Sequence, residues 1–146
     1  MGHHPGKQQV AMEHRHSCTV PLVPGSVRAA RERAERSLAL FGMDAGSSLG
    51  GAVLLVVSEL VANAVRHAQG SPDAEITLTK TDRLLVVRVG DLDPCPILLA
   101  SRSTGEGLRT VEDLARAYDG DVHVQPAADG NGKTVVVRFV LPDPAP

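Results

Sequence analysis

Aromatic residues and cysteines are scarce in this chain of 146 residues. Aromatics make up 2% of the sequence and tryptophan is missing, so side chains on which nucleic-acid bases could stack are almost absent. The two cysteines, Cys18 and Cys95, stand far apart and form neither a Cys-x-x-Cys pair nor a disulfide framework. Their spacing favours a reducing, cytoplasmic compartment. Any bound base would have to be held by aliphatic walls.

A basic excess and a long apolar run are missing as well. The net charge is −2, whereas proteins that bind nucleic acid or anionic membranes carry an excess of basic residues. Residues 1–15 are polar, without the apolar stretch of a secretion signal, and no run approaches the ~18 apolar residues that a membrane span requires. We therefore expect a soluble cytoplasmic protein whose partners include neither nucleic acid nor a membrane.

The length of the chain is that of one domain. Residues 1–16 lack periodicity and are expected to form a flexible tail, residues 17–142 the domain and residues 143–146 a second tail. His14, His16 and Cys18 would share one face of an extended strand, which raises the alternative of a metal site. No fourth ligand is evident, so ordinary tail residues are the favoured interpretation.

Hydrophobic periodicity and turn residues predict three helices and five strands. The helices cover residues 27–41, 48–68 and 106–118, and the strands cover residues 17–23, 74–80, 83–91, 122–125 and 134–141. The second helix is apolar over most of its length and should be the central buried helix, with Gly70 as its C-cap. Strands paired by hairpins, with helices between them, predict an α+β fold. It is a two-layer sandwich with a mixed, mostly antiparallel sheet and helices on one face.

The first predicted helix has two contrasting faces. Its apolar stripe consists of Val27, Ala30, Ala34, Leu38 and Phe41. The opposite face is rich in arginine and glutamate, and two interpretations stand side by side, a solvated surface and a partner-binding face.

Glu59, Asn63 and His67 follow one another at four-residue spacing on the second helix. Such residues drift by only ~40° per step and form one polar stripe. A solvated amphipathic face is the alternative interpretation, but apolar residues precede the stripe by one turn on nearly the same face. The pattern favours a polar patch in a partly dry groove.

Asp91 closes a strand whose period-2 alternation places it on the same face as Leu85, Val87 and Val89. A carboxylate at the rim of a buried sheet face needs a partner. Asp91 either caps the loop that follows or accepts a hydrogen bond from a ligand, such as the amino group of adenine.

Gly105 and Gly107 stand at the start of the third helix, where free backbone N–H groups and the helix dipole favour an anion such as a phosphate. Ser103 and Glu106 can equally form an ordinary capping box there. The chain has no Gly-x-x-x-x-Gly-Lys-Ser/Thr motif, which counts against a P-loop, and no dinucleotide-binding fingerprint.

Four segments in this order resemble motifs of the Bergerat-type (GHKL) ATP-binding domains shared by gyrase, histidine kinases and mismatch-repair ATPases, and most closely the small anti-sigma-factor serine/threonine kinases. Residues 59–67 resemble the N box of that family and residues 87–91 its adenine-binding strand. Residues 105–108 resemble its second glycine box, and residues 132–134 its final motif. The resemblance covers most of the chain and implies the Bergerat ATP-binding fold.

The resemblance implies ATP and Mg²⁺ as ligands. Asn63 would be a ligand of the Mg²⁺ ion that bridges the phosphates, because Mg²⁺ prefers oxygen ligands. Glu59 would be the polar or general-base residue beside the γ-phosphate. Asp91 would be the partner of adenine.

The remaining matches imply supporting roles in the same site. Gly105, Gly107 and Leu108 would offer backbone groups to phosphate, and Thr134 would support Asp91 or a bound water. His67 would either reach a phosphate or complement the dipole at the end of its helix, of which the second is favoured.

The sequence departs from the family pattern at two places. The usual Asp-x-Gly becomes Asp91-Leu92-Asp93, and the lost glycine puts the path of the loop over adenine in question. The segment between Pro94 and Thr104 is a short lid, expected to close over nucleotide or to pack against a second subunit.

The function that the resemblance implies is that of an ATP-dependent serine/threonine kinase. Such a protein sequesters a sigma factor, phosphorylates an anti-sigma-factor antagonist and forms a homodimer. The alternative is a non-catalytic ATP-binding module for protein interaction, which the altered position Asp93 favours. A histidine-kinase fragment is disfavoured because the residues before Val27 are too few for a phospho-accepting helical hairpin.

Overall fold

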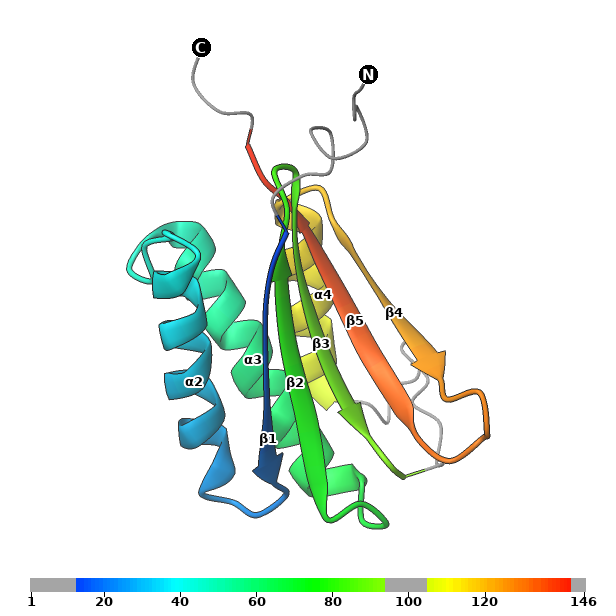
Figure 1. Ribbon diagram of the computed structural model, residues 1–146. Coiled ribbons are helices and arrows are strands. Elements are labelled where there is room, and N and C mark those ends of the chain that lie inside the picture. The colour runs from blue at the N-terminus through cyan, green and yellow to red at the C-terminus, as the bar shows by residue number, and fades with distance from the viewer. Residues whose placement is uncertain (1–12, 94–104, 143–146) are drawn as a thin grey trace, which may run out of the picture.

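The computed structural model describes residues 13–93 and 105–142, and within the latter range the side chains from Leu108 onward. Three helices cover one face of a five-stranded sheet (Figure 1). The strands are β1 (His14–Pro21), β2 (Asp73–Lys80), β3 (Leu84–Asp91), β4 (Asp121–Pro126) and β5 (Lys133–Val140). The helices are α2 (Ser26–Leu40), α3 (Ser48–His67) and α4 (Gly105–Ala117). The predicted two-layer α+β sandwich is thus confirmed.

The sheet has the order β1-β2-β3-β5-β4, and each neighbouring pair is antiparallel. We expected a mixed sheet, and the described strands correct this detail. The connection from β3 runs through α4 to β4 at the far edge, and a hairpin then returns β5 to the gap between β3 and β4. Because β5 enters in the opposite direction to both neighbours, no parallel pair arises.

Two predicted boundaries differ from the structure. β1 begins at His14 instead of residue 17, because His14 already pairs with Lys80 at the end of β2. α3 ends at His67, and its C-cap is Ala68, whose N–H donates to the carbonyl of Ala64. Gly70 is therefore not the cap, and its N–H donates to the Asp93 carboxylate instead, at 3.0 Å.

The face of the sheet under the helices carries the core. Opposite residues on β3 and β5 form apolar pairs, Leu85 with Phe139 and Val87 with Val137, all of which are inaccessible to solvent. From α2 and its C-cap residue, the predicted stripe contributes four buried residues, Ala30, Ala34, Leu38 and Phe41, with Val27 packed at the margin. Burial between the sheet and the helices explains the apolar patterns of β3, β5 and α2.

α3 lies between α2 and α4 and also contacts β3, as Figure 1 shows. By length and composition it could cross a membrane, contrary to the expectation that no segment would qualify. The share of the apolar window that is buried inside the domain is 56%. α3 is apolar because protein surrounds it on several sides, which is the situation of a core helix.

His14 and His16 point to the helix side of the edge strand β1. Their ring centroids lie 5.9 Å and 5.3 Å from that of Phe41. Among the described residues, no group of three or more His, Cys, Asp or Glu side chains could hold a metal ion. His14 and His16 thus pack against Phe41, and Cys18, the third residue of the alternation, packs against the hydrophobic core.

The opposite face of the sheet carries polar contacts between neighbouring strands. Ser17 Oγ and Thr77 Oγ1 lie 3.0 Å apart across β1 and β2. Arg138 on β5 pairs with Asp121 on β4, and the hydrogen bond from its guanidinium lowers the pKa of the Asp121 carboxyl. A lowered pKa means that this contribution to stability is present near neutral pH and is lost as the pH falls through it. Both side chains are half exposed, so the contribution is small.

Two adjacent glycines, Gly50 and Gly51, provide a test of how the first turn of α3 packs against the loop before it. A Cβ on Gly50 would lie 2.4 Å from the carbonyl oxygen of Asp44, whereas a Cβ on Gly51 would meet nothing within 4 Å. We expect Gly50→Ala to reduce the free energy of unfolding by about 1–3 kcal/mol because of overpacking. Gly51→Ala should raise it by about 1 kcal/mol, since alanine favours the helix. Urea unfolding of both variants measures the difference, and equal effects would contradict the described contact.

Candidate functional site

The polar stripe on α3 runs from a half-buried to an exposed position. Glu59 is half-buried, Asn63 is 3% exposed and His67 is exposed at the end of the helix. Glu59 and Asn63 are four residues apart and so lie on one face. His67 stands in the last turn of α3 together with Arg66, where positive charge complements the helix dipole.

Asn63 has an unusual environment for an amide side chain. Its Oδ1 atom is buried, and no hydrogen-bond partner for it exists among the described residues. A buried carbonyl oxygen without a partner carries a desolvation cost of roughly 1–3 kcal/mol. An oxygen of this kind is also a ligand type that Mg²⁺ accepts, so the described residues fit the predicted metal role of Asn63.

Asp91 ends β3 on the face that the helices cover, as the alternation predicted. Its side chain is 6% exposed and forms an ion pair with Lys133, which is 7% exposed; the distance between Asp91 Oδ1 and Lys133 Nζ is 3.0 Å. The same oxygen accepts a hydrogen bond from the N–H of Asp93 at 2.9 Å. Asp91 thus caps its own loop, one of the two predicted roles, and finds its charged partner within the chain.

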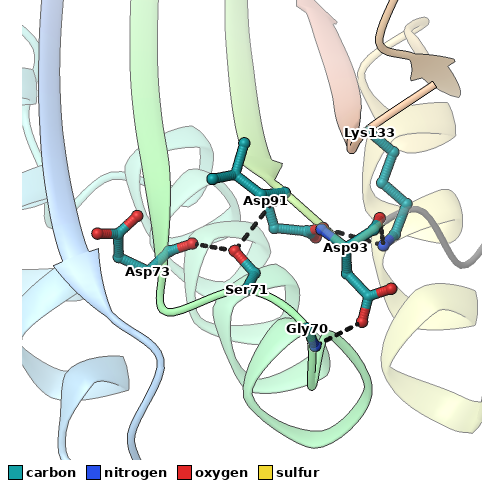
Figure 2. A network of polar contacts seen from close by, with 7 residues as sticks. Gly70, Ser71, Asp73, Asp91, Asp93 and Lys133 are labelled. Carbon is teal, nitrogen blue, oxygen red and sulfur yellow. Dashed lines mark hydrogen bonds and ion pairs between the residues drawn. The ribbon is translucent and has the colours of Figure 1, made fainter. Parts of the chain in front are cut away.

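A network of polar contacts extends from this ion pair to the end of α3 (Figure 2). Lys133 Nζ also donates to the carbonyl oxygen of Asp93 at 3.0 Å. The Asp93 carboxylate turns away from Asp91 and accepts the N–H of Gly70. Ser71 Oγ accepts the N–H of Leu92 at 2.9 Å and donates to the carbonyl of Asp73 at 2.6 Å.

These contacts hold the Asp91-Leu92-Asp93 segment from two sides. One side is the loop after α3, which contributes Gly70 and Ser71, and the other is the start of β5, which contributes Lys133 (Figure 2). Gly132 permits the close approach of β5, since its φ is +128° and a Cβ there would lie 2.4 Å from the carbonyl oxygen of Asp91. The loop therefore has a defined path although the family glycine is replaced by Asp93.

The start of α4 lies at the same edge of the domain as the ends of α3 and β3 and the start of β5 (Figure 1). Gly105 is its first residue, and Gly107 follows in the first turn. The Leu108 side chain is 1% exposed and belongs to the core, which anchors the turn. Its predicted contact with phosphate through the backbone stays a prediction. Ser103, and the lid between Pro94 and Thr104, lie outside the described residues.

Thr134 and Asp91 lie on opposite faces of the sheet. The register pairs Thr134 with Gly90 and Lys133 with Asp91, and Thr134 Oγ1 lies 3.0 Å from the point where a Cβ of Gly90 would be. It is therefore Lys133, and not Thr134, that meets the Asp91 carboxylate. The sequence carried a signal for Lys133, because alternation backward from Phe139 through Val137 and Val135 places it on the buried face.

A cavity of about 190 Å³ lies elsewhere, between β1 and α2, with His16, Cys18, Arg33 and Ser37 among its lining residues. No residue of the predicted nucleotide site lines it. Its volume is below the ~300 Å³ at which sites for small-molecule ligands usually begin. The cavity is separate from the candidate site.

Comparison with known proteins establishes the family. The histidine kinase-like ATPase domain family matches residues 20–139, and the chain belongs to this family. Membership implies that the chain binds ATP. No curated protein matches the chain.

Solved structures with the same fold include proteins of two kinds. The RsbU and RsbW domains of Rv1364c from Mycobacterium tuberculosis are 18% identical, with a TM-score of 0.63, over 89% of this chain and 34% of that one. The blue-light activated histidine kinase of Erythrobacter litoralis is 18% identical, with a TM-score of 0.53, over 82% and 61%. The mycobacterial sensor histidine kinase MprB is 15% identical, with a TM-score of 0.51, over 84% and 97%. The chain thus spans about a third of the first structure, and these similarities show the fold.

Ser71 offers a test of the network. Replacing Ser71 by Ala removes the acceptor of the part-buried hydrogen bond from the N–H of Leu92, so we expect the free energy of unfolding to fall by about 0.5–1.5 kcal/mol. Thr79→Val is the matched control, because Thr79 Oγ1 is buried and has no partner among the described residues; its loss should be neutral or stabilising. Urea denaturation compares the two variants. A Ser71→Ala protein as stable as the wild type would show that the Leu92 contact contributes nothing.

Proposed function

We propose that the chain is an ATP-dependent serine/threonine kinase of the anti-sigma type, which sequesters a sigma factor and phosphorylates an anti-sigma-factor antagonist. The observation that carries the proposal is the buried Oδ1 atom of Asn63, which lacks a partner among the described residues. A Mg²⁺ ion bound to ATP phosphates would satisfy it. The similarity to a structure that contains an RsbW domain supports the anti-sigma type.

The positions of the site residues support the following roles. Asn63 would hold the Mg²⁺ ion through its amide oxygen, and the start of α4 at Gly105 and Gly107 would meet the phosphates with backbone N–H groups. Asp91 would accept a hydrogen bond from the amino group of adenine. A carboxylate has two oxygens with about four acceptor positions, so the two bonds to Oδ1 leave room for this third one.

Glu59 would act in the transfer step. Its carboxylate would accept the proton of a serine or threonine hydroxyl on the antagonist, while that oxygen forms a bond to the γ-phosphorus and the bond to the bridging oxygen breaks. The products are ADP and the phosphorylated antagonist. The half-buried position of Glu59, one turn before Asn63, supports this role.

The assembly and location of the protein are part of the same proposal. A homodimer in the cytoplasm would place the kinase beside its sigma factor and antagonist. Thr134 and His67 are assigned supporting roles, Thr134 through a bound water on its own side of the sheet and His67 through the dipole of α3.

Calorimetric titration with ATP tests the role of Asn63. We expect Asn63→Ala to lose the Mg²⁺-dependent part of the affinity, about tenfold or more, because one oxygen ligand of the ion is removed, while binding without Mg²⁺ is retained. Gln125→Ala removes an exposed amide on the other face of the sheet and should bind ATP as the wild type does. An Asn63→Ala protein with the full Mg²⁺ dependence would remove Asn63 from the metal site.

Transfer of label from [γ-³²P]ATP tests the kinase activity. We expect a serine or threonine of a cognate antagonist to be labelled, and the rate to fall by about 10²-fold or more in Glu59→Gln, which lacks the proton acceptor. Glu75→Gln, at an exposed position of β2, should keep the wild-type rate. ATP binding without transfer to any cognate antagonist would contradict the kinase and favour the non-catalytic ATP-binding module.

A further inference from the structure

Lys133 is a buried charged residue beside Asp91, the proposed partner of the adenine base. It stands directly opposite Asp91, and the next pair on the same face, Val89 with Val135, is apolar. Its side chain is 7% exposed. A lysine ammonium is rarely buried unless it is paired. Here Asp91 Oδ1 and the carbonyl oxygen of Asp93 accept from it, each at 3.0 Å.

We propose that Lys133 is the positioning residue for base recognition. It holds the Asp91 carboxylate in one orientation, so that the other oxygen of Asp91 accepts a hydrogen bond from the amino group of a purine. This inference rests on the proposed ATP binding and assigns a role to Lys133, the middle residue of the final motif, to which the resemblance gave none.

The hydrogen bonds of the Asp91 carboxylate support this role of Lys133. Oδ1 of Asp91 accepts both the Lys133 ammonium and the N–H of Asp93. Two donors from different segments, β5 and the loop after β3, fix the plane of the carboxylate. Its remaining capacity is concentrated on Oδ2. An acceptor that is fixed before the ligand arrives loses less conformational entropy on binding than a freely rotating one.

The course of the loop after β3 also supports this role of Lys133. Asp93 brings a side chain to a position where the family has none, yet Figure 2 shows that this side chain points to Gly70 and away from Asp91. The Lys133 ammonium bridges Asp91 and the backbone of Asp93. Lys133 therefore holds the loop in a conformation in which the Asp93 side chain lies away from the Asp91 carboxylate.

A purely structural ion pair is the competing explanation. A buried ion pair is often no more stabilising than apolar residues of the same volume, because both charges lose their hydration. The two explanations differ in what they predict for the base. A structural pair supports all nucleotides equally, whereas a positioning lysine affects only those whose base carries the amino group.

The test compares ATP with inosine triphosphate, which has an oxo group in place of the amino group. We expect the wild type to prefer ATP roughly tenfold or more, the range of a hydrogen bond to a charged group. In Lys133→Met the preference should fall at least threefold while the affinity for inosine triphosphate stays within about twofold. Lys80→Met, the same change at the other end of the same face, should leave both affinities unchanged.

Each alternative result has its own meaning. An equal loss of affinity for both nucleotides in Lys133→Met, or a loss of thermal stability alone, would overturn the inference in favour of a structural pair. A wild type that binds both nucleotides equally would overturn it as well, while leaving nucleotide binding intact. A wild type that binds neither nucleotide would instead refute the proposed function.

A measurement on the wild type covers the case in which Lys133→Met does not fold. The chain has three lysines, Lys7, Lys80 and Lys133, so side-chain ammonium signals in ¹⁵N-lysine-labelled protein can be assigned with Lys7→Arg and Lys80→Arg. The Lys133 signal should shift with ATP and shift less with inosine triphosphate. A Lys133 signal that moves identically with both, or with neither, would overturn the inference.

Discussion

The burial of α3 is the constraint on which the rest of the domain depends. α3 lies between α2 and α4 and contacts β3, and Val53, Val56, Val57 and Val61 are inaccessible to solvent. A buried polar group on such a helix costs free energy unless a hydrogen-bond partner or a ligand satisfies it. Glu59 and Asn63 break its apolar course near one end. The site therefore sits where the core helix leaves the core, at the edge that also receives the ends of β3 and β5.

The polar network beside this edge shows how a binding loop can keep its shape after losing a glycine. In most positions a new aspartate next to a buried carboxylate would add repulsion. Here the N–H of Gly70, in the loop after α3, donates a hydrogen bond to the Asp93 carboxylate. Lys133 of β5 donates to the Asp91 carboxylate and to the carbonyl oxygen of Asp93. Asp93 and Lys133 therefore belong to one network of contacts. Lys133 offsets the negative charge of Asp91, and the backbone of Asp93 accepts a hydrogen bond from the buried ammonium.

The sequence was sufficient for much of the fold and for part of the site. Periodicity places α2, α3 and the strands to within a few residues, because each has one clearly apolar face. Alternation likewise places Asp91 on the buried face. The error at Gly70 arose because a glycine after a helix is usually a cap, whereas this one donates to a residue far along the chain.

Long-range pairing is what the sequence could not specify. The contact between Asp91 and Lys133 depends on the register of β3 against β5, and that register follows from the packing of the whole sheet. The same holds for Thr134, which shares a motif with Lys133 but lies on the other face. Motifs define which residues are near one another along the chain. They do not define the face on which each side chain emerges.

The strand order has a consequence for the way the chain acquires its structure during synthesis. Among the described strands β5 comes last in the chain, yet it lies inside the sheet and joins β4 to the β1-β2-β3 part. Until it emerges from the ribosome, β3 presents an open apolar edge and the carboxylate of Asp91 lacks its cation. Vectorial synthesis therefore delays closure of both the core and the site to a single late event. The nascent domain is exposed to misassociation until that event, and it becomes competent to bind a ligand only afterwards.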